Sequence, residues 1–60
     1  MNYDIPSDPV MLLSFINLKL RDFYPSLDAL CEDLDIDENS LRDRLAAIDC
    51  HYDATINKFI

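Results

Sequence analysis

The apolar residues of this 60-residue chain recur at helical spacing in separate segments. At the start of the first segment, Asp8 is suited to cap a helix and Pro9 to occupy its first position, where a missing N–H costs nothing. Pro25 ends the segment, because the residue before a proline is driven out of the helical conformation. The pattern predicts a first helix over about residues 8–23.

Two shorter helices are predicted after the first. One covers about residues 26–34 and begins with Ser26, a good N-cap. Its apolar positions are Leu27, Leu30, Cys31 and Leu34. The other covers about residues 37–48 and begins with Asp37, which Ile36 precedes at the spacing of a hydrophobic staple. Its apolar positions are Leu41, Leu45 and Ile48.

The helical period is lost after the third helix. Residues 50–52 and 58–60 are typical of two short strands, which predicts a β-hairpin over about residues 50–60. The chain has no glycine, which favours helices joined by short corners over a sheet protein. We therefore expect one small, mainly α domain over residues 1–60, in which three helices precede a short C-terminal β-hairpin.

The predicted core consists of the apolar side of each helix and at least one aromatic ring of the hairpin. Ser14, Asn17 and Arg21 are expected on the polar face of the first helix, with a surface hydrogen bond or ion pair among Asn17, Arg21 and Asp22. The expected core residues are Leu12, Leu13, Ile16, Leu20, Phe23, Leu27, Leu30, Leu34, Ile36, Leu41, Leu45, Ile48 and one or more of Tyr52 and Phe59.

A second apolar row on the first helix is the candidate functional feature. At about 100° per residue, Met11, Phe15 and Leu18 fall on a different side from the core residues. Two interpretations remain open. Either the hairpin, or Tyr3 and Ile5 of the N-terminal segment, covers the row, or the row contacts a second copy of the chain or another protein, since exposed apolar patches mark contact sites.

The middle of the chain resembles a helix-turn-helix unit, and with the hairpin it resembles a winged helix. In residues 30–45, Cys31 is a small residue at the close helix contact. Asp35 stands at the corner, where glycine is usual, although aspartate also tolerates the left-handed conformation. This pattern suggests a nucleic-acid-binding regulator as the alternative function.

The charge of the chain argues against that alternative. There are 12 acidic residues and 5 basic ones, for a net charge of -7. Affinity for nucleic acid depends largely on neutralising phosphates, which this surface would repel. A non-catalytic protein–protein interaction module or a homodimer, using Met11, Phe15 and Leu18, is therefore the favoured function.

No pattern in the sequence indicates catalysis, a cofactor or a metal site. His51 is the single histidine, and neither Cys31 nor Cys50 has an obvious activating partner. As neighbours in a strand, Cys50 and His51 would point to opposite faces and would not bind one ion together. We expect no enzymatic activity, no cofactor and no metal.

The N-terminal residues and the cysteines indicate the cellular compartment in which we expect the protein. The N-terminal segment has neither a basic residue nor a long apolar run, so we expect no signal peptide and no membrane segment. The two cysteines are not in a C-x-x-C pair. We expect a cytoplasmic protein with reduced thiols.

Several short motifs spread over nearly the whole chain resemble one known family. They are Asp8 to Ser14, Asn17 to Asp22, Ser26-Leu27, Leu30-Cys31, Tyr52-Asp53 and Asn57 to Phe59. With these motifs the chain resembles a small bacterial family classified as a domain of unknown function, DUF family forty-two fifty. Members of that family are similarly short, stand-alone proteins, which implies that this chain is complete. The resemblance implies no activity, ligand or partner.

Overall fold

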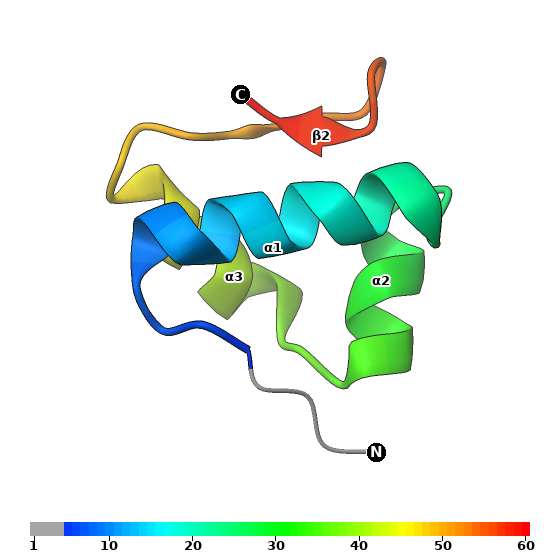
Figure 1. Cartoon of the computed structure of the whole chain (residues 1–60), viewed down its shortest axis with the longest axis horizontal. Helices are drawn as coiled ribbons and strands as arrows, with labels where there is room; N and C mark the ends of the chain where they lie inside the picture. The colour runs from blue at the N-terminus through cyan, green and yellow to red at the C-terminus, as the bar shows by residue number, and fades with distance from the viewer. Residues whose placement is uncertain (1–4) are drawn as a thin grey trace.

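The computed structural model describes residues 5–60, which form three helices and a two-stranded hairpin (Figure 1). The expected mainly α class is confirmed, and each helix lies within two residues of its predicted bounds. The elements are α1 (Pro9–Asp22), α2 (Leu27–Leu34), α3 (Glu38–Ala46), β1 (Tyr52–Asp53) and β2 (Lys58–Phe59).

The helices begin where capping residues occur in the sequence. The side chains of Asp8, Ser26 and Asp37 each accept a hydrogen bond from the backbone N–H three residues further on, at 3.1–3.2 Å. Each bond satisfies one of the donors that a helix start leaves without an intrahelical partner. All three predicted caps are confirmed.

The ends of α2 and α3 share one backbone motif. Asp35 and Asp49 have φ values of 56° and 60°, in the left-handed region. The N–H of the residue after each aspartate donates to a carbonyl oxygen five residues earlier, at 2.9 Å in both cases. This is the Schellman helix end, here built without glycine. Because the turn begins after Ala46, Ile48 lies outside the helix, and the predicted end of the third helix at residue 48 is wrong by two residues.

The hairpin is confirmed, and its register determines which backbone groups face outward. Tyr52 lies opposite Phe59 in an antiparallel pair. One residue beyond, His51 and Ile60 exchange two backbone hydrogen bonds of 2.8 and 2.9 Å. Hydrogen-bonded and non-hydrogen-bonded pairs alternate in such a ladder, so the N–H and C=O of Phe59 point away from β1.

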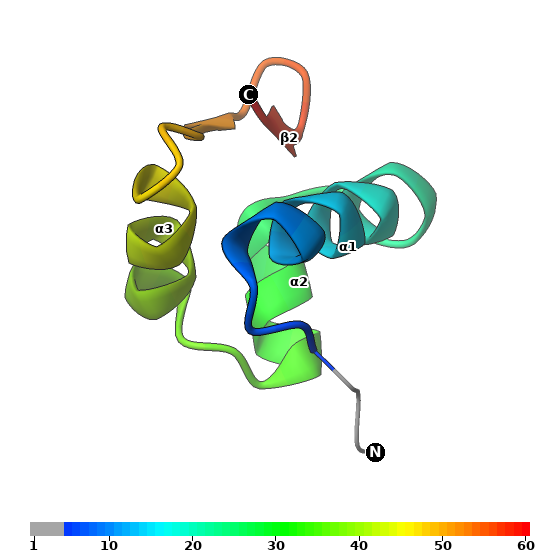
Figure 2. The ribbon, with the colours of Figure 1, turned by 60° about the vertical axis from the view of Figure 1, so that its left-hand side comes forward.

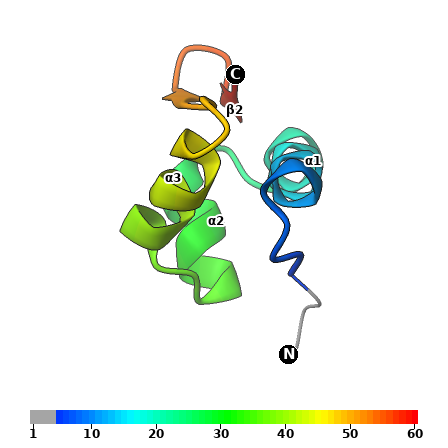
Figure 3. The same cartoon turned by 90° about the vertical axis from the view of Figure 1, so that its left-hand side faces the viewer.

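The core lies among the three helices, and Phe59 of the hairpin closes it. In the views of Figures 1, 2 and 3 the hairpin lies at one end of the molecule and the α2–α3 corner at the other. β2 runs beside α1 in this arrangement. The buried apolar residues are Leu12, Ile16, Leu20, Leu27, Leu30, Cys31, Leu34, Leu41, Leu45 and Phe59.

The expected core differs from this in a few residues. Phe23 was expected inside, but it is 66% exposed, so that prediction is wrong. The reason is local: α1 ends at Asp22, the backbone leaves the helical conformation at Phe23 (φ -126°), and Tyr24 packs against the core instead. Four residues are partly buried at the edge of the core and not inside it: Leu13, Ile36, Ile48 and Tyr52.

Candidate functional site

The three predicted contact residues differ in exposure: two are exposed and one is half-buried. Met11 is 62% exposed and Leu18 is 46% exposed. Phe15, between them in sequence, is half-buried and packs against the core. Phe15 therefore contributes to core packing as well as to the predicted contact surface. Met11, Phe15 and Leu18 are named the α1 contact surface below.

Of the expected covers, neither the hairpin nor Ile5 buries the exposed residues of this surface. Ile5 lines a separate cavity of about 370 Å³, together with Leu12, Ile36 and Leu41, and Tyr3 lies outside the described residues. The hairpin packs along a different side of α1, as shown below. Within the described residues, Met11 and Leu18 remain exposed to solvent.

A lysine borders the α1 contact surface. The Nζ of Lys19 lies 5.4 Å from the centroid of the Phe15 ring and 4.9 Å from that of the Phe23 ring. An ammonium group over an aromatic face is attracted by the ring quadrupole. The part of the α1 contact surface nearest the C-terminal end of α1 therefore combines aromatic rings with a positive charge.

The hairpin is attached to α1 by an asparagine that was expected to face solvent. Asn17 is half-buried; its Nδ2 donates to the carbonyl oxygen of Phe59 at 3.1 Å, and its Oδ1 accepts from the N–H of Phe59 at 2.8 Å. The amide thus occupies the outer edge of β2, as a neighbouring strand would. The prediction of a polar solvent face at Asn17 is wrong because the hairpin, which is distant in sequence, covers it. Arg21 and Asp22 do form the expected surface ion pair.

A second asparagine, Asn57, for which the sequence predicted no structural role, joins the other end of the hairpin to α1. Asn57 has a φ of 53°, and its Nδ2 donates to the carbonyl oxygens of Leu20 (3.2 Å) and Tyr24 (3.0 Å). Its Oδ1 accepts from the Tyr52 hydroxyl at 2.6 Å. The side chain therefore satisfies carbonyls that the end of α1 leaves unpaired. The sequence signal that could have identified Asn57 is an asparagine in a turn without glycine, because asparagine tolerates the left-handed conformation.

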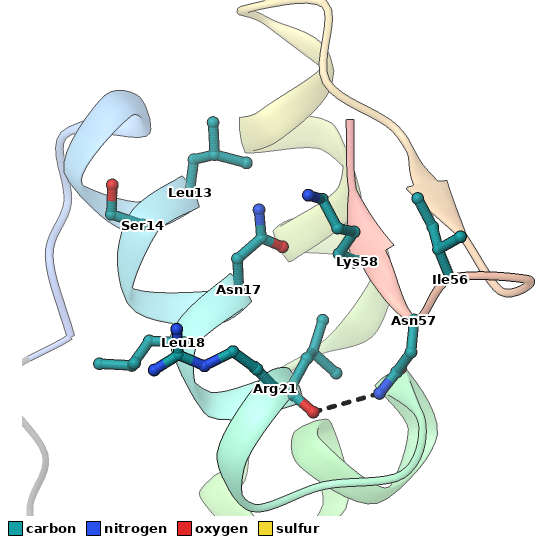
Figure 4. A pocket seen from close by; sticks show the side chains of 9 residues that line it. Leu13, Ser14, Asn17, Leu18, Arg21, Ile56, Asn57 and Lys58 are labelled. Carbon is teal, nitrogen blue, oxygen red and sulfur yellow. Dashed lines mark hydrogen bonds between the residues drawn. The ribbon is translucent and has the colours of Figure 1, made fainter.

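An open groove of about 680 Å³ lies between α1 and the hairpin (Figure 4). Leu13 and Leu18 of α1 and Ile56 of the turn are its main apolar residues. Arg21 and Lys58 are its charged residues. The groove therefore adjoins the α1 contact surface, because Leu18 belongs to both.

Arg21 and Asp22 form a paired charge at the rim of the groove. Arg21 Nε lies 3.0 Å from Asp22 Oδ1, and Nη2 donates to Oδ2 at 3.2 Å. The hydrogen bond raises the pKa of Arg21 and lowers the pKa of Asp22. Both side chains are exposed, so the pair contributes little to stability.

Comparison with known proteins identifies the family. The family model for a domain of unknown function, DUF4250, matches residues 6–59. The chain belongs to the DUF4250 family. No curated protein and no solved structure shows significant similarity to it.

The cysteines and the histidine of this DUF4250 protein lie apart from the groove. Cys31 and Cys50 are both free, and burial raises the pKa of the Cys31 thiol. The exposed His51 lies beside an exposed carboxylate, with Nε2 3.4 Å from Asp49 Oδ1. Over residues 5–60, no three histidine, cysteine or acidic residues are grouped closely enough to hold a metal ion.

The predicted helix-turn-helix segment of this DUF4250 protein has an acidic surface. The acidic residues on α2 and at the corner before α3 are exposed, and the Tyr24 hydroxyl donates to one of them, Asp33. Arg42, on α3, is paired with Glu38 at 2.9 Å and lies over the Tyr52 ring, with Cζ 5.7 Å from its centroid. The likeness to DNA-binding units stays a prediction. In the described part of the chain, no helix has the length and apolar character needed to span a bilayer.

Proposed function

We propose that this DUF4250 protein is a non-catalytic, cytoplasmic protein-binding module that uses the α1 contact surface. The observation that carries the proposal is the exposure of Met11 and Leu18 on one side of α1, with the half-buried Phe15 between them in the sequence. Exposed apolar groups that lie together are typical of contact sites. The two free cysteines suit a reducing compartment.

The energy available at this surface indicates a contact of modest strength. Full burial of a leucine or methionine side chain contributes about 1.5–3 kcal/mol. Since Met11 is 62% exposed and Leu18 is 46% exposed, covering the remaining surface contributes roughly half of that for each. A specific partner must therefore also contact neighbouring residues, such as those of the groove.

The test compares glutamate substitutions at neighbouring exposed positions of α1. Met11→Glu places a charge on the α1 contact surface, whereas Val10→Glu makes the same kind of change about a quarter-turn away, at a residue of similar exposure. Self-association is measured by light scattering from about 1 µM to about 1 mM, the range in which weak contacts appear. Binding to other proteins is measured by capture from a lysate of the source organism.

The proposal predicts that Met11→Glu removes the dimer or the captured protein, and that Val10→Glu leaves it in place. Concentration-dependent dimers would show that the partner is a second copy of the chain. If Met11→Glu and Leu18→Glu behave as the unsubstituted protein does in both measurements, the proposal is wrong. Phe15→Glu is a poor test, because Phe15 also packs against the core.

A further inference from the structure

The groove beside the α1 contact surface is locally cationic. Arg21 lines it from α1 and Lys58 lines it from β2, and among the described residues that line it none is acidic. Lys58 forms no ion pair within residues 5–60, and the exposed pair of Arg21 with Asp22 is weak. Asp53, opposite Lys58 in the hairpin, accepts a hydrogen bond from a backbone N–H of the turn. The lining of the groove therefore holds two cations and no anion on a chain whose net charge is -7, with Asp22 paired to Arg21 at its rim.

The uncharged polar groups of the groove are largely engaged by the protein itself. The amide of Asn17 uses its donor and its acceptor on the backbone of Phe59. The amide of Asn57 is bonded to carbonyl oxygens at the end of α1 and to the Tyr52 hydroxyl. The remaining polar side chains of the lining are Ser14, Arg21 and Lys58, of which the two cations attract carboxylates.

The cationic groove and the apolar surface form one continuous area. Leu18 belongs to both, and Leu13 and Ile56 extend the apolar lining toward the hairpin (Figure 4). Ile56 is 51% exposed, so it is open to a ligand. One bound segment can therefore place apolar side chains on Met11 and Leu18 and carboxylates near the two cations.

The acidic α2–α3 corner is distant enough not to repel a short acidic segment bound in the groove. The α2–α3 corner and the hairpin lie at opposite ends of a molecule that measures 28 × 26 × 18 Å. Interactions between exposed charges are screened over about 8 Å at physiological ionic strength. A long polyanion such as a nucleic acid would extend onto the acidic end, whereas a short acidic peptide would not.

We propose that the partner segment is an acidic amphipathic peptide, whose apolar side chains cover the α1 contact surface and whose carboxylates bind Arg21 and Lys58 in the groove. This inference rests on the proposed protein-binding function and specifies the chemistry of the partner. The two cations of the groove attract carboxylates and repel basic side chains, which makes the site selective against basic segments.

The experiment selects peptides from a random library displayed on phage, with the folded protein as the target. Selected peptides should combine Asp or Glu with apolar residues. Exposed ion pairs contribute about 0.2–1 kcal/mol each, so Lys58→Gln and Arg21→Gln should each weaken binding of a selected peptide by a factor between about 1.4 and about 5. Arg44→Gln, on α3 outside the groove, removes the same charge and should leave the affinity unchanged.

Three results would overturn the inference: selected peptides without acidic residues, no selected peptide, or equal weakening by Arg44→Gln and Lys58→Gln. Apolar, uncharged peptides that lose binding with Leu18→Glu would overturn the carboxylate contact alone and leave the proposed function in place. The proposed function is judged separately by the self-association and capture measurements.

Discussion

At the residue scale, two asparagine side chains decide how the hairpin meets α1. An amide offers donors and an acceptor at a fixed separation. Asn17 uses them on the N–H and C=O of one strand residue, Phe59. Asn57 donates to two carbonyl oxygens at and just beyond the end of α1 and accepts from the Tyr52 hydroxyl. Both residues are half-buried, so their bonds are partly shielded from water. In a hairpin whose strands have two residues each, these contacts replace the ladder that longer strands would provide.

The first prediction concerns Asn17→Ala. The change leaves the N–H and C=O of Phe59 without partners, and the free energy of unfolding should fall by about 1–3 kcal/mol. Amide hydrogen exchange at Phe59 should become faster. Ser14→Ala, at an exposed polar position of the same helix, is the matched control and should change little. Equal stability of the two variants in urea unfolding would contradict this role.

The second prediction concerns Cys31 and pH. Burial raises the pKa of this thiol in the folded protein above its ordinary value of 9.0. Above about pH 9 the unfolded chain therefore loses the proton more readily than the folded protein does, and the free energy of unfolding should decrease until the pH reaches the folded pKa.

Urea unfolding between about pH 7 and about pH 10 measures this loss. Cys31→Ala should flatten the decrease with pH, and Cys50→Ala, at the half-buried free cysteine, is the control. An identical pH dependence in the unsubstituted protein and in Cys31→Ala would show that the thiol has no part in it.

At the element scale, short helices without glycine depend on polar residues at both ends. Their starts are capped by Asp or Ser side chains. Two of their ends place an aspartate in the left-handed region, at Asp35 and Asp49. Only a few residue types other than glycine adopt that conformation at low cost. The α2–α3 corner therefore depends on the residue type at its turn.

The third prediction concerns this corner. Asp35→Val should lower the free energy of unfolding by about 1–2 kcal/mol, because a β-branched residue is strained in the left-handed region. Asp35→Gly should leave stability unchanged or raise it by up to about 1 kcal/mol. The exposed side chain makes few contacts, so the pair isolates the backbone effect. Thermal unfolding of both variants is the measurement, and equal melting temperatures would show that the corner is not strained.

At the scale of the whole molecule, charge and apolar exposure are distributed unevenly. The α2–α3 corner is acidic, and the α1–hairpin side has exposed apolar residues together with Arg21 and Lys58. A nucleic acid requires a broad cationic surface. On α3, Arg42 is already paired with Glu38.

The fourth prediction is therefore that the protein shows no binding to mixed-sequence duplex DNA, even at low ionic strength. Fluorescence anisotropy at about 20 mM salt is a sensitive measurement, because phosphate contacts are strongest there. Binding that weakens steeply as salt is added would contradict the prediction and support the helix-turn-helix alternative.

Features that depend on near neighbours in the chain were predictable from the residues alone. Caps at Asp8, Ser26 and Asp37, the left-handed corner at Asp35, and the apolar period of each helix involve residues only a few positions apart. The same local information predicted most of the core and the hairpin. It also placed Met11 and Leu18 on a row separate from the core.

What covers each remaining side of α1 depends on long-range packing that local patterns do not contain. Asn17 is polar and lies on the expected polar face, yet Phe59, 42 residues away, covers it. Phe23 is apolar at a core-like position, yet α1 ends one residue before it. The cationic groove likewise requires Arg21 and Lys58 from distant parts of the chain. Helical periodicity reports the direction of a side chain, whereas burial depends on which distant segment packs there.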